Sequence, residues 1–215
     1  MTPERDAHLE AGRLLFARPV EFVKSCVDLQ GLPETGLPEV CFAGRSNVGK
    51  SSLINALTNQ NGLARASNTP GRTRELNYFN ASDRLYLVDL PGYGYARASK
   101  TDIARWTRLT RAFLRGRQAL RRVFVLVDSR HGLKPSDLEL FEMLDEAAVT
   151  YQVVLTKVDK IKAGALATVV AKTEAAIAKR PAAFPGILAT SSEKGTGIAE
   201  LRAEIAALAL APDDL

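Results

Sequence analysis

Residues 44–51 of this 215-residue chain have the sequence Gly44-Arg45-Ser46-Asn47-Val48-Gly49-Lys50-Ser51. This G-x-x-x-x-G-K-S pattern lies between an apolar run and a segment with helical spacing, which is the context that a phosphate-binding loop requires. In such a loop the backbone N–H groups and the helix N-terminus surround the phosphates. We expect Lys50 to contact the terminal phosphates and act in catalysis, Ser51 to bind Mg²⁺, and Ser52 to complete the site. The alternative is a glycine-rich turn that matches the pattern by chance.

Apolar runs alternate with helical segments along the rest of the chain. The candidate strands are Glu39–Ala43, Glu75–Asn80, Leu85–Asp89, Val123–Asp128, Tyr151–Thr156 and Gly186–Thr190. The candidate helices are Gly49–Leu57, Thr101–Gln118, Ala163–Lys179 and Gly197–Leu210, with another that begins at a Ser136/Glu139 capping box. Glu75–Asn80 alternates and is followed by a short turn, which indicates a hairpin. The pattern predicts an α/β P-loop domain: a mostly parallel six-stranded sheet, one antiparallel edge strand, and helices on both faces.

Two further motifs follow predicted strands. In Asp89-Leu90-Pro91-Gly92 the carboxylate can hold Mg²⁺ through its water shell, and the N–H of Gly92 can meet the γ-phosphate during hydrolysis. In Thr156-Lys157-Val158-Asp159 the carboxylate of Asp159 can accept two hydrogen bonds from guanine, while the stem of Lys157 packs over the base. Adenine lacks those two donors, so this motif favours GTP over ATP. Ser191-Ser192, after the last strand, is expected to supply a backbone N–H to the guanine O6.

The segment Asn68-Thr69-Pro70-Gly71-Arg72-Thr73-Arg74 lies between the first two motifs. A switch GTPase needs a loop hydroxyl that closes onto Mg²⁺ when the γ-phosphate is present. Thr73 is the first candidate for this metal-binding and catalytic role and Thr69 is the second, with Gly71 and Arg72 also beside the nucleotide. An ordinary Pro-Gly turn explains Pro70 and Gly71 but not the flanking threonines.

Positive charge is concentrated in one segment. The chain has a net charge of +5, but residues 97–122 hold nine Lys/Arg and one acid, so this segment carries +8. On a helix, the arginines Arg105, Arg108, Arg111 and Arg115 fall on one side, opposite Ile103, Trp106, Thr110, Phe113 and Leu114. A solvated helix face is the alternative. The unmixed sign favours a surface for a polyanion such as RNA.

Composition places the chain among globular proteins: 46% of its residues are hydrophobic and 25% are charged. We expect an N-terminal extension over 1–37, a GTPase domain over 38–210 and a tail over 211–215. No apolar run is long enough for a membrane helix, and no lipidation motif is present. With two cysteines and no disulfide framework, a cytoplasmic protein is expected. We also expect a monomer.

The motifs GRSNVGKSS, TPGRT, DLPGYGYA, DSRHGL, LTKVDK and SSEKGTG together resemble the EngB/YihA/YsxC ribosome-biogenesis GTPases, a branch of the TrmE-Era-EngA-like class. The resemblance extends from about Phe22 to Leu208. It implies a single GTPase domain that binds GTP and GDP with Mg²⁺ and acts in large-subunit assembly. The ribosome or its RNA would then be the partner of the arginine helix.

Two positions depart from or refine this picture. Tyr93 stands where many GTPases place a glutamine that orients the attacking water, so we expect slow hydrolysis that a partner stimulates. Asn47 matches the position at which some relatives help to bind K⁺. An equal alternative is a polar loop residue whose side chain hydrogen-bonds to the local backbone.

The rival functions are a P-loop ATPase, a GTP-binding module with little or no turnover, and a membrane-signalling GTPase.

Overall fold

The computed structural model describes residues 3–34, 36–64, 75–94 and 100–209. The elements in chain order are α1 (Pro3–Leu15), β1 (Glu21–Cys26), β2 (Glu39–Gly44), α2 (Lys50–Thr58), β3 (Leu76–Ala81), β4 (Leu85–Asp89), α3 (Lys100–Gly116), β5 (Leu120–Asp128), α4 (Pro135–Glu146), β6 (Tyr151–Thr156), the 3₁₀ turn η1 (Val158–Lys160), α5 (Ala163–Ile177), β7 (Leu188–Ala189) and α6 (Ile198–Ala209). All six predicted strands are present, and one more precedes them.

The strands form one sheet in the order β1-β3-β4-β2-β5-β6-β7. Only β3 among these strands runs against the others, because it is antiparallel to both β1 and β4 while the remaining pairs are parallel. The antiparallel strand was predicted correctly, but its place at the edge was wrong: β1 lies outside it. Five of the six residues of β1 are exposed, so the strand gives no apolar run in the sequence. Its ladder with β3 and the edge-to-face contact of Phe22 with Phe79 hold it in place.

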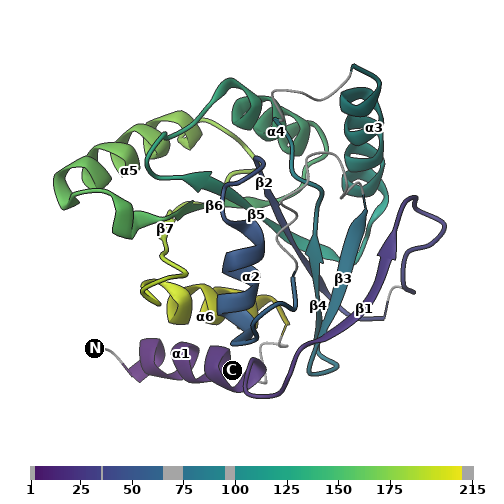
Figure 1. The fold of residues 1–215 in the computed structure, drawn as a ribbon, viewed down its shortest axis with the longest axis horizontal. Helices are drawn as coiled ribbons and strands as arrows, with labels where there is room; N and C mark the ends of the chain where they lie inside the picture. The colour runs from purple at the N-terminus through teal and green to yellow at the C-terminus, as the bar shows by residue number, and fades with distance from the viewer. Residues whose placement is uncertain (1–2, 35, 65–74, 95–99, 210–215) are drawn as a thin grey trace.

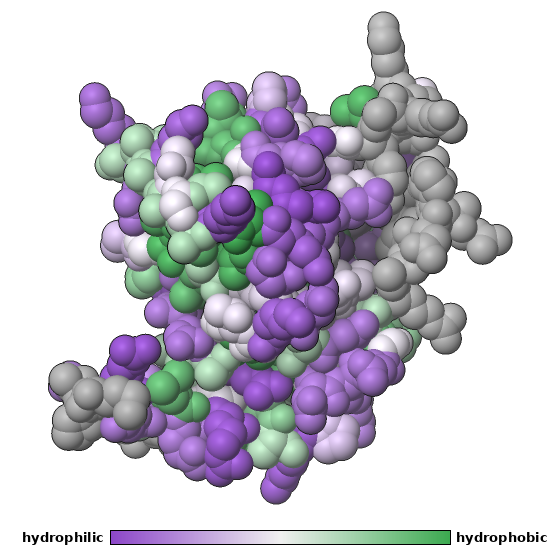
Figure 2. Space-filling model, turned by 60° about the vertical axis from the view of Figure 1, so that its left-hand side comes forward, coloured by the Kyte–Doolittle hydropathy of each residue, from purple (hydrophilic) through white to green (hydrophobic). Residues whose placement is uncertain are grey.

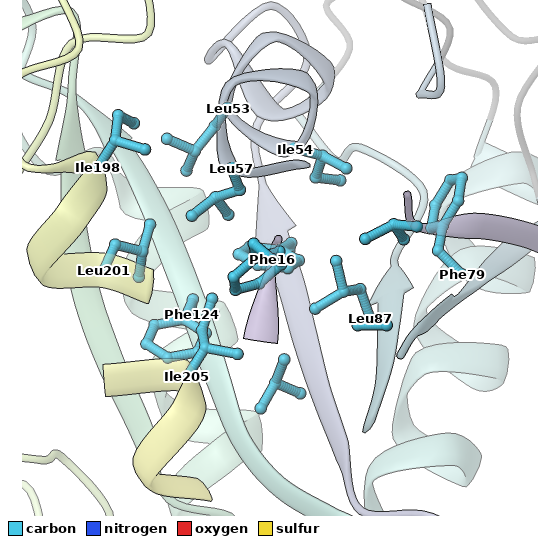
Figure 3. Packing of buried hydrophobic residues seen from close by; sticks show 14 of the residues in the cluster. Phe16, Leu53, Ile54, Leu57, Phe79, Leu87, Phe124, Ile198, Leu201 and Ile205 are labelled. Carbon is cyan, nitrogen blue, oxygen red and sulfur yellow. The ribbon is translucent and has the colours of Figure 1, made fainter. Parts of the chain in front are cut away.

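Helices cover both faces of the sheet (Figure 1). Alternate residues of the strands point to opposite faces, so Val40 and Phe42 of β2 belong to one hydrophobic cluster and Cys41 and Ala43 to another. The first cluster lies under α1, α2 and α6, and Figure 3 shows Phe16 surrounded by side chains of α2, α6 and the sheet. The second cluster lies under α3, α4 and α5. Both faces of the central strands are therefore buried, as their continuous apolar sequence predicts.

The N-terminal stretch is more ordered than the expected irregular extension. Helix α1 packs along α6, and Leu15 and Phe16 at its end are buried. Gly12 lets the two helices approach closely, because a Cβ at this position would lie 2.5 Å from the backbone nitrogen of Ala203. The sequence pattern missed this helix because its apolar side chains have a partner only in the tertiary structure.

Gly12→Ala is therefore expected to lower the free energy of unfolding by about 1–3 kcal/mol, since the added methyl group forces α1 away from α6. Alanine normally stabilises a helix relative to glycine by about 1 kcal/mol. Gly164→Ala in α5 is the matched control, because a Cβ there meets nothing within 4 Å. Urea denaturation measures both variants. Stabilisation of Gly12→Ala equal to that of Gly164→Ala would contradict the close packing.

The start of α4 also differs from the predicted capping box. Proline fits the first helical position, where no N–H is needed, so the helix begins at Pro135. The N–H of Lys134 donates to Oδ2 of Asp137 at 2.8 Å, and Asp137 takes the role that was predicted for Glu139.

The surface in Figure 2 is mostly hydrophilic on the side shown, with hydrophobic residues interspersed in small groups. No helix in the described part of the chain has both the length and the apolar character needed to cross a membrane.

Candidate nucleotide site

The predicted phosphate-binding loop connects β2 to α2. Gly49 has a φ of 104° and Asn47 a φ of 62°, so the chain passes twice through the left-handed region before the helix starts at Lys50. Gly44 allows close packing, because a Cβ there would lie 2.8 Å from Cγ1 of Val48. The first and last glycines of the motif thus have different roles: the first permits close packing and the last a left-handed turn.

Lys50 and Asp89 lie side by side although 39 residues separate them. Strands β2 and β4 are parallel neighbours, so their carboxyl ends meet at the same edge of the sheet. The ammonium Nζ of Lys50 contacts Oδ1 of Asp89, and both side chains are largely buried. Ser51, in the first turn of α2, is half-buried next to this pair. Ser52 is exposed.

The turn after β4 lies against the phosphate-binding loop. The N–H of Ser46 donates to the carbonyl oxygen of Tyr93 at 2.9 Å, and the N–H of Tyr93 faces the carbonyl of Gly44 at 3.3 Å. A Cβ on Gly92 would lie 3.4 Å from the Cα of Ser46. The structure therefore brings together the first two motifs through their backbones, with the glycine at the closest approach.

The side chain of Tyr93 is buried between α3 and α4. Its hydroxyl donates to Oδ1 of Asp137 at 2.8 Å, and its ring centroid lies 5.4 Å from that of Trp106. Burial raises the pKa of Tyr93 well above its ordinary value, and Asp137 adds to this effect. Burial also raises the pKa of Asp137, against the hydrogen bonds that it accepts. In this arrangement the tyrosine hydroxyl is engaged in the protein interior and does not replace the missing glutamine.

The end of β6 is tied to the phosphate-binding loop. The hydroxyl of Thr156 donates to the carbonyl of Val48 at 2.7 Å. Lys157 has a φ of 59°, and its Nζ donates to the carbonyl of Asn47 at 2.6 Å and to Oδ2 of Asp128 at 2.9 Å. The expected base motif and the expected phosphate motif are thus parts of one site.

Asp159 and Ser191 also meet. The hydroxyl of Ser191 donates to Oδ1 of Asp159 at 2.5 Å, and Nζ of Lys160 lies 3.0 Å from Oδ2. These hydrogen bonds lower the pKa of Asp159, so the carboxylate is charged and can accept hydrogen bonds from a base. Ser192 follows and is half-buried. Gly71, Arg72, Thr73 and the second candidate Thr69 lie outside the described residues.

Asp128, Arg130 and Asp137 were not predicted as site residues. Asp128 bonds to the predicted Lys157, Arg130 bonds to Asp128, and Asp137 bonds to Tyr93. Asp128 ends β5, the strand between the two that carry the phosphate and base motifs. A polar residue at the carboxyl end of a predicted central strand is the signal that identifies it, because ligands bind at that edge of a parallel sheet. With residues 45–48, these three side chains line a polar cavity of about 180 Å³.

The arginine face of α3 comprises Arg105, Arg108, Arg111 and Arg115, all of which are exposed. Arg111 and Arg115 both lie 3.6 Å from Glu146 of α4, and Arg105 and Arg108 form no ion pair with the described residues. Of the predicted inner side, Phe113, Leu114 and Thr110 are buried and Trp106 is half-buried. Ile103 was placed there wrongly: it is 53% exposed, since it lies in the first turn of α3 and no described side chain covers it.

The basic segment as a whole is less exposed than its charge suggested. Arg117 is largely buried and bonds to both carboxylate oxygens of Glu39, with Nε at 2.9 and 3.0 Å. Arg122 is buried and bonds to Glu204 at 2.9 Å and to Gln152 at 3.0 Å. Both arginines are structural, because their partners come from strands and helices distant in sequence. Among the basic side chains of this segment whose exposure the structure describes, those of the arginine face and Arg121 remain exposed.

A G-x-x-x-x-G-K-S loop, a D-x-x-G turn on its backbone and a T-K-x-D motif beside it on a mostly parallel sheet define a P-loop GTPase. Residues 39–157 match the family model described as "50S ribosome-binding GTPase". The chain belongs to this family, and among its members it is similar to the EngB GTP-binding proteins.

Individual relatives support this placement over nearly the whole chain. A "Probable GTP-binding protein EngB" of Caulobacter vibrioides (strain NA1000 / CB15N) is 59% identical over 205 residues, which covers 95% of this chain and 90% of the relative. The protein of the same description from Hyphomonas neptunium (strain ATCC 15444) is 62% identical over 205 residues, with 94% and 93% covered. A crystal structure of a probable GTP-binding protein engB shares the fold, with a TM-score of 0.65 and 24% identity over 79% of this chain and 97% of that chain.

Proposed function

We propose that this chain is a GTP-dependent switch in assembly of the large ribosomal subunit, and that its arginine face binds ribosomal RNA in the GTP state. The observation that carries the proposal is the arginine face itself. It presents four exposed arginines on a helix that contacts the D-x-x-G turn. The family description, a ribosome-binding GTPase, agrees with such a partner. Two free and buried cysteines suit a reducing compartment, so we extend the proposal to a cytoplasmic protein.

In the proposed site, Lys50 and the loop backbone hold the phosphates of GTP, and Asp159 with the Ser191–Ser192 loop recognises the guanine base. Mg²⁺ fits the residues present, because a carboxylate and a hydroxyl are hard oxygen donors of the kind it prefers. Ser51 and Asp89 would hold it, together with Thr73, and it would supply charge neutralisation at the phosphates. Lys50 already contacts Asp89, so it exchanges this carboxylate for phosphate oxygens when GTP binds.

Trp106 can couple a nucleotide-dependent movement of the Asp89–Gly92 turn to α3. Its indole Nε1–H donates to the carbonyl of Pro91 at 2.8 Å, inside the Asp89–Gly92 turn. The ring of Trp106 also contacts Tyr93, which follows Gly92. A shift of this turn toward the γ-phosphate would therefore pull on the helix that carries the arginine face. We expect stronger binding to the large subunit with a GTP analogue than with GDP.

Reversal of Arg105, Arg108 and Arg115 to Glu tests the partner surface. We expect about tenfold or greater loss of affinity for large subunits and a flatter dependence on salt, because phosphate contacts release counterions. Cosedimentation at several salt concentrations measures both. GTP binding should be retained, since these side chains contact no nucleotide motif.

The matched control reverses Lys162, Lys172 and Lys179, which are exposed on or next to α5 and change the net charge equally. Loss in the α3 variant alone supports the proposal. If the α3 variant cosediments like the unmodified chain, the arginine face is a solvated surface; equal loss in both variants would show an effect of net charge.

Potassium dependence is the second test. The side-chain amide of Asn47 forms no hydrogen bond with any residue that the structure describes, and the residue is exposed at the mouth of the loop. We propose that this amide helps to hold K⁺ beside the developing charge on the phosphates. GTP hydrolysis should then be faster in K⁺ than in Na⁺, and Asn47→Ala should abolish the difference. Equal rates of GTP hydrolysis in the two salts would remove Asn47 from this role.

A further inference from the structure

Asp128 lies at the carboxyl end of β5, in the DSRHGL stretch to which the proposed function assigns no role. Strand β5 pairs with β2 on one side and β6 on the other, so this end lies between the phosphate motif and the base motif. The carboxylate is only 10% exposed. It accepts hydrogen bonds from Lys157 Nζ at 2.9 Å and from Arg130, whose Nε and terminal nitrogen lie at 3.0 and 2.7 Å.

Few contacts with the described residues fix the position of the Lys157 side chain. Its backbone is in the left-handed region, and its long stem passes over the loop, where a Cβ on Gly49 would lie 3.4 Å from Cε. A lysine side chain has many accessible rotamers, so a defined orientation requires an anchor. The carbonyl of Asn47 and the carboxylate of Asp128 are the two acceptors of its ammonium among the described residues. Of the two, only Asp128 carries a charge.

We propose that Asp128 is a positioning residue of the nucleotide site: it holds the ammonium of Lys157 so that the stem lies in place over the guanine base before nucleotide binds. The inference rests on the nucleotide site proposed above. Arg130 is 43% exposed and is the second cation on the same carboxylate, on the solvent side. Asp128 thus connects the central strand of the sheet to the lysine of the base motif.

The charge state of Asp128 agrees with this role. Burial acts to raise the pKa of Asp128, but the hydrogen bonds from Arg130 and Lys157 outweigh it and hold the pKa well below its ordinary value. The group is an anion throughout the neutral range. Its negative charge is therefore available to Lys157 throughout this range.

Asp128→Asn is the test, because it keeps the shape of the side chain and removes the charge. We expect GDP and GTP to bind about tenfold more weakly, the loss of one charge-assisted hydrogen bond. A double-mutant cycle with Lys157→Met separates positioning from a structural role. When Lys157 is already removed, Asp128→Asn should weaken GDP binding no further. Fluorescence titration with a labelled GDP measures all four proteins.

Asp145→Asn is the matched control, since it makes the same chemical change in another largely buried carboxylate, which pairs with Arg180 at 2.9 Å and contacts no nucleotide motif, and it should leave GDP affinity unchanged. Equal weakening by Asp128→Asn with and without Lys157, or by Asp145→Asn, would show that Asp128 has only a structural role, and would overturn the proposal. Tight GDP binding by Asp128→Asn would also overturn it. Unchanged GDP affinity in Lys157→Met alone would instead contradict the nucleotide site on which the inference rests.

Discussion

Lys50→Ala lowers the affinity for GTP by at least about a hundredfold in our expectation. Lys50 is the lysine of the phosphate-binding motif that we expect to contact the terminal phosphates, and hydrogen bonds to charged groups contribute about 1.5–3 kcal/mol each. Contacts with two phosphate groups would contribute twice as much, or about 3–6 kcal/mol. Equilibrium binding of a labelled GTP analogue measures the loss. Lys172→Ala on α5, an exposed lysine far from the site in sequence, is the control.

The structure adds a consequence that the motif does not predict. Lys50 contacts Asp89, and removal of one member of a buried ion pair costs about 3–5 kcal/mol. The nucleotide-free variant should therefore also unfold more easily, although the core is untouched. Lys50→Gln retains a hydrogen-bond donor toward Asp89 without the charge, and it keeps the binding test valid if the alanine variant does not fold. Unchanged GTP affinity in a folded Lys50→Gln protein would contradict the assignment of the loop.

Asp159→Asn is expected to change the preferred base from guanine to xanthine. Xanthine has a carbonyl in place of the 2-amino donor of guanine, so an amide NH₂ can meet it where a carboxylate cannot. About 1.5–3 kcal/mol for a charge-assisted hydrogen bond predicts at least a tenfold loss for GTP. A similar gain for XTP would change the ratio of the two affinities by about a hundredfold. Competition of XTP and GTP with labelled GDP measures this ratio.

The contacts of Asp159 allow this exchange. The hydroxyl of Ser191 remains a donor to the amide oxygen, which takes the place of Oδ1. Lys160 would face the NH₂ group, but it already contacts Glu193 at 2.5 Å and can keep that partner. Asp83→Asn, in the exposed turn between β3 and β4, makes the same chemical change away from the site. Absence of any gain for XTP would show that Asp159 does not bind the base.

The sequence predicted the central fold well because buried parallel strands have a local signal. Strands β2, β4, β5 and β6 are nearly continuous apolar runs, and each was predicted within a few residues of its bounds. Strand β1 and helix α1 have no such signal. Their residues are mostly exposed, and they are stabilised by β3 and α6, whose positions depend on the rest of the fold.

The sequence by itself determined the phosphate loop, the D-x-x-G turn and the base motif. Each of these is a short run of residues whose backbone and side-chain chemistry is defined locally. Only the tertiary structure decided which charges remain on the surface: Arg117 and Arg122 are buried against Glu39 and Glu204, 78 and 82 residues away. It also decided that Asp128 anchors Lys157 and that Asp137 binds Tyr93. The physical reason is that these pairs form where neighbouring strands end or helices pack, and such meetings depend on the strand order, which no local pattern contains.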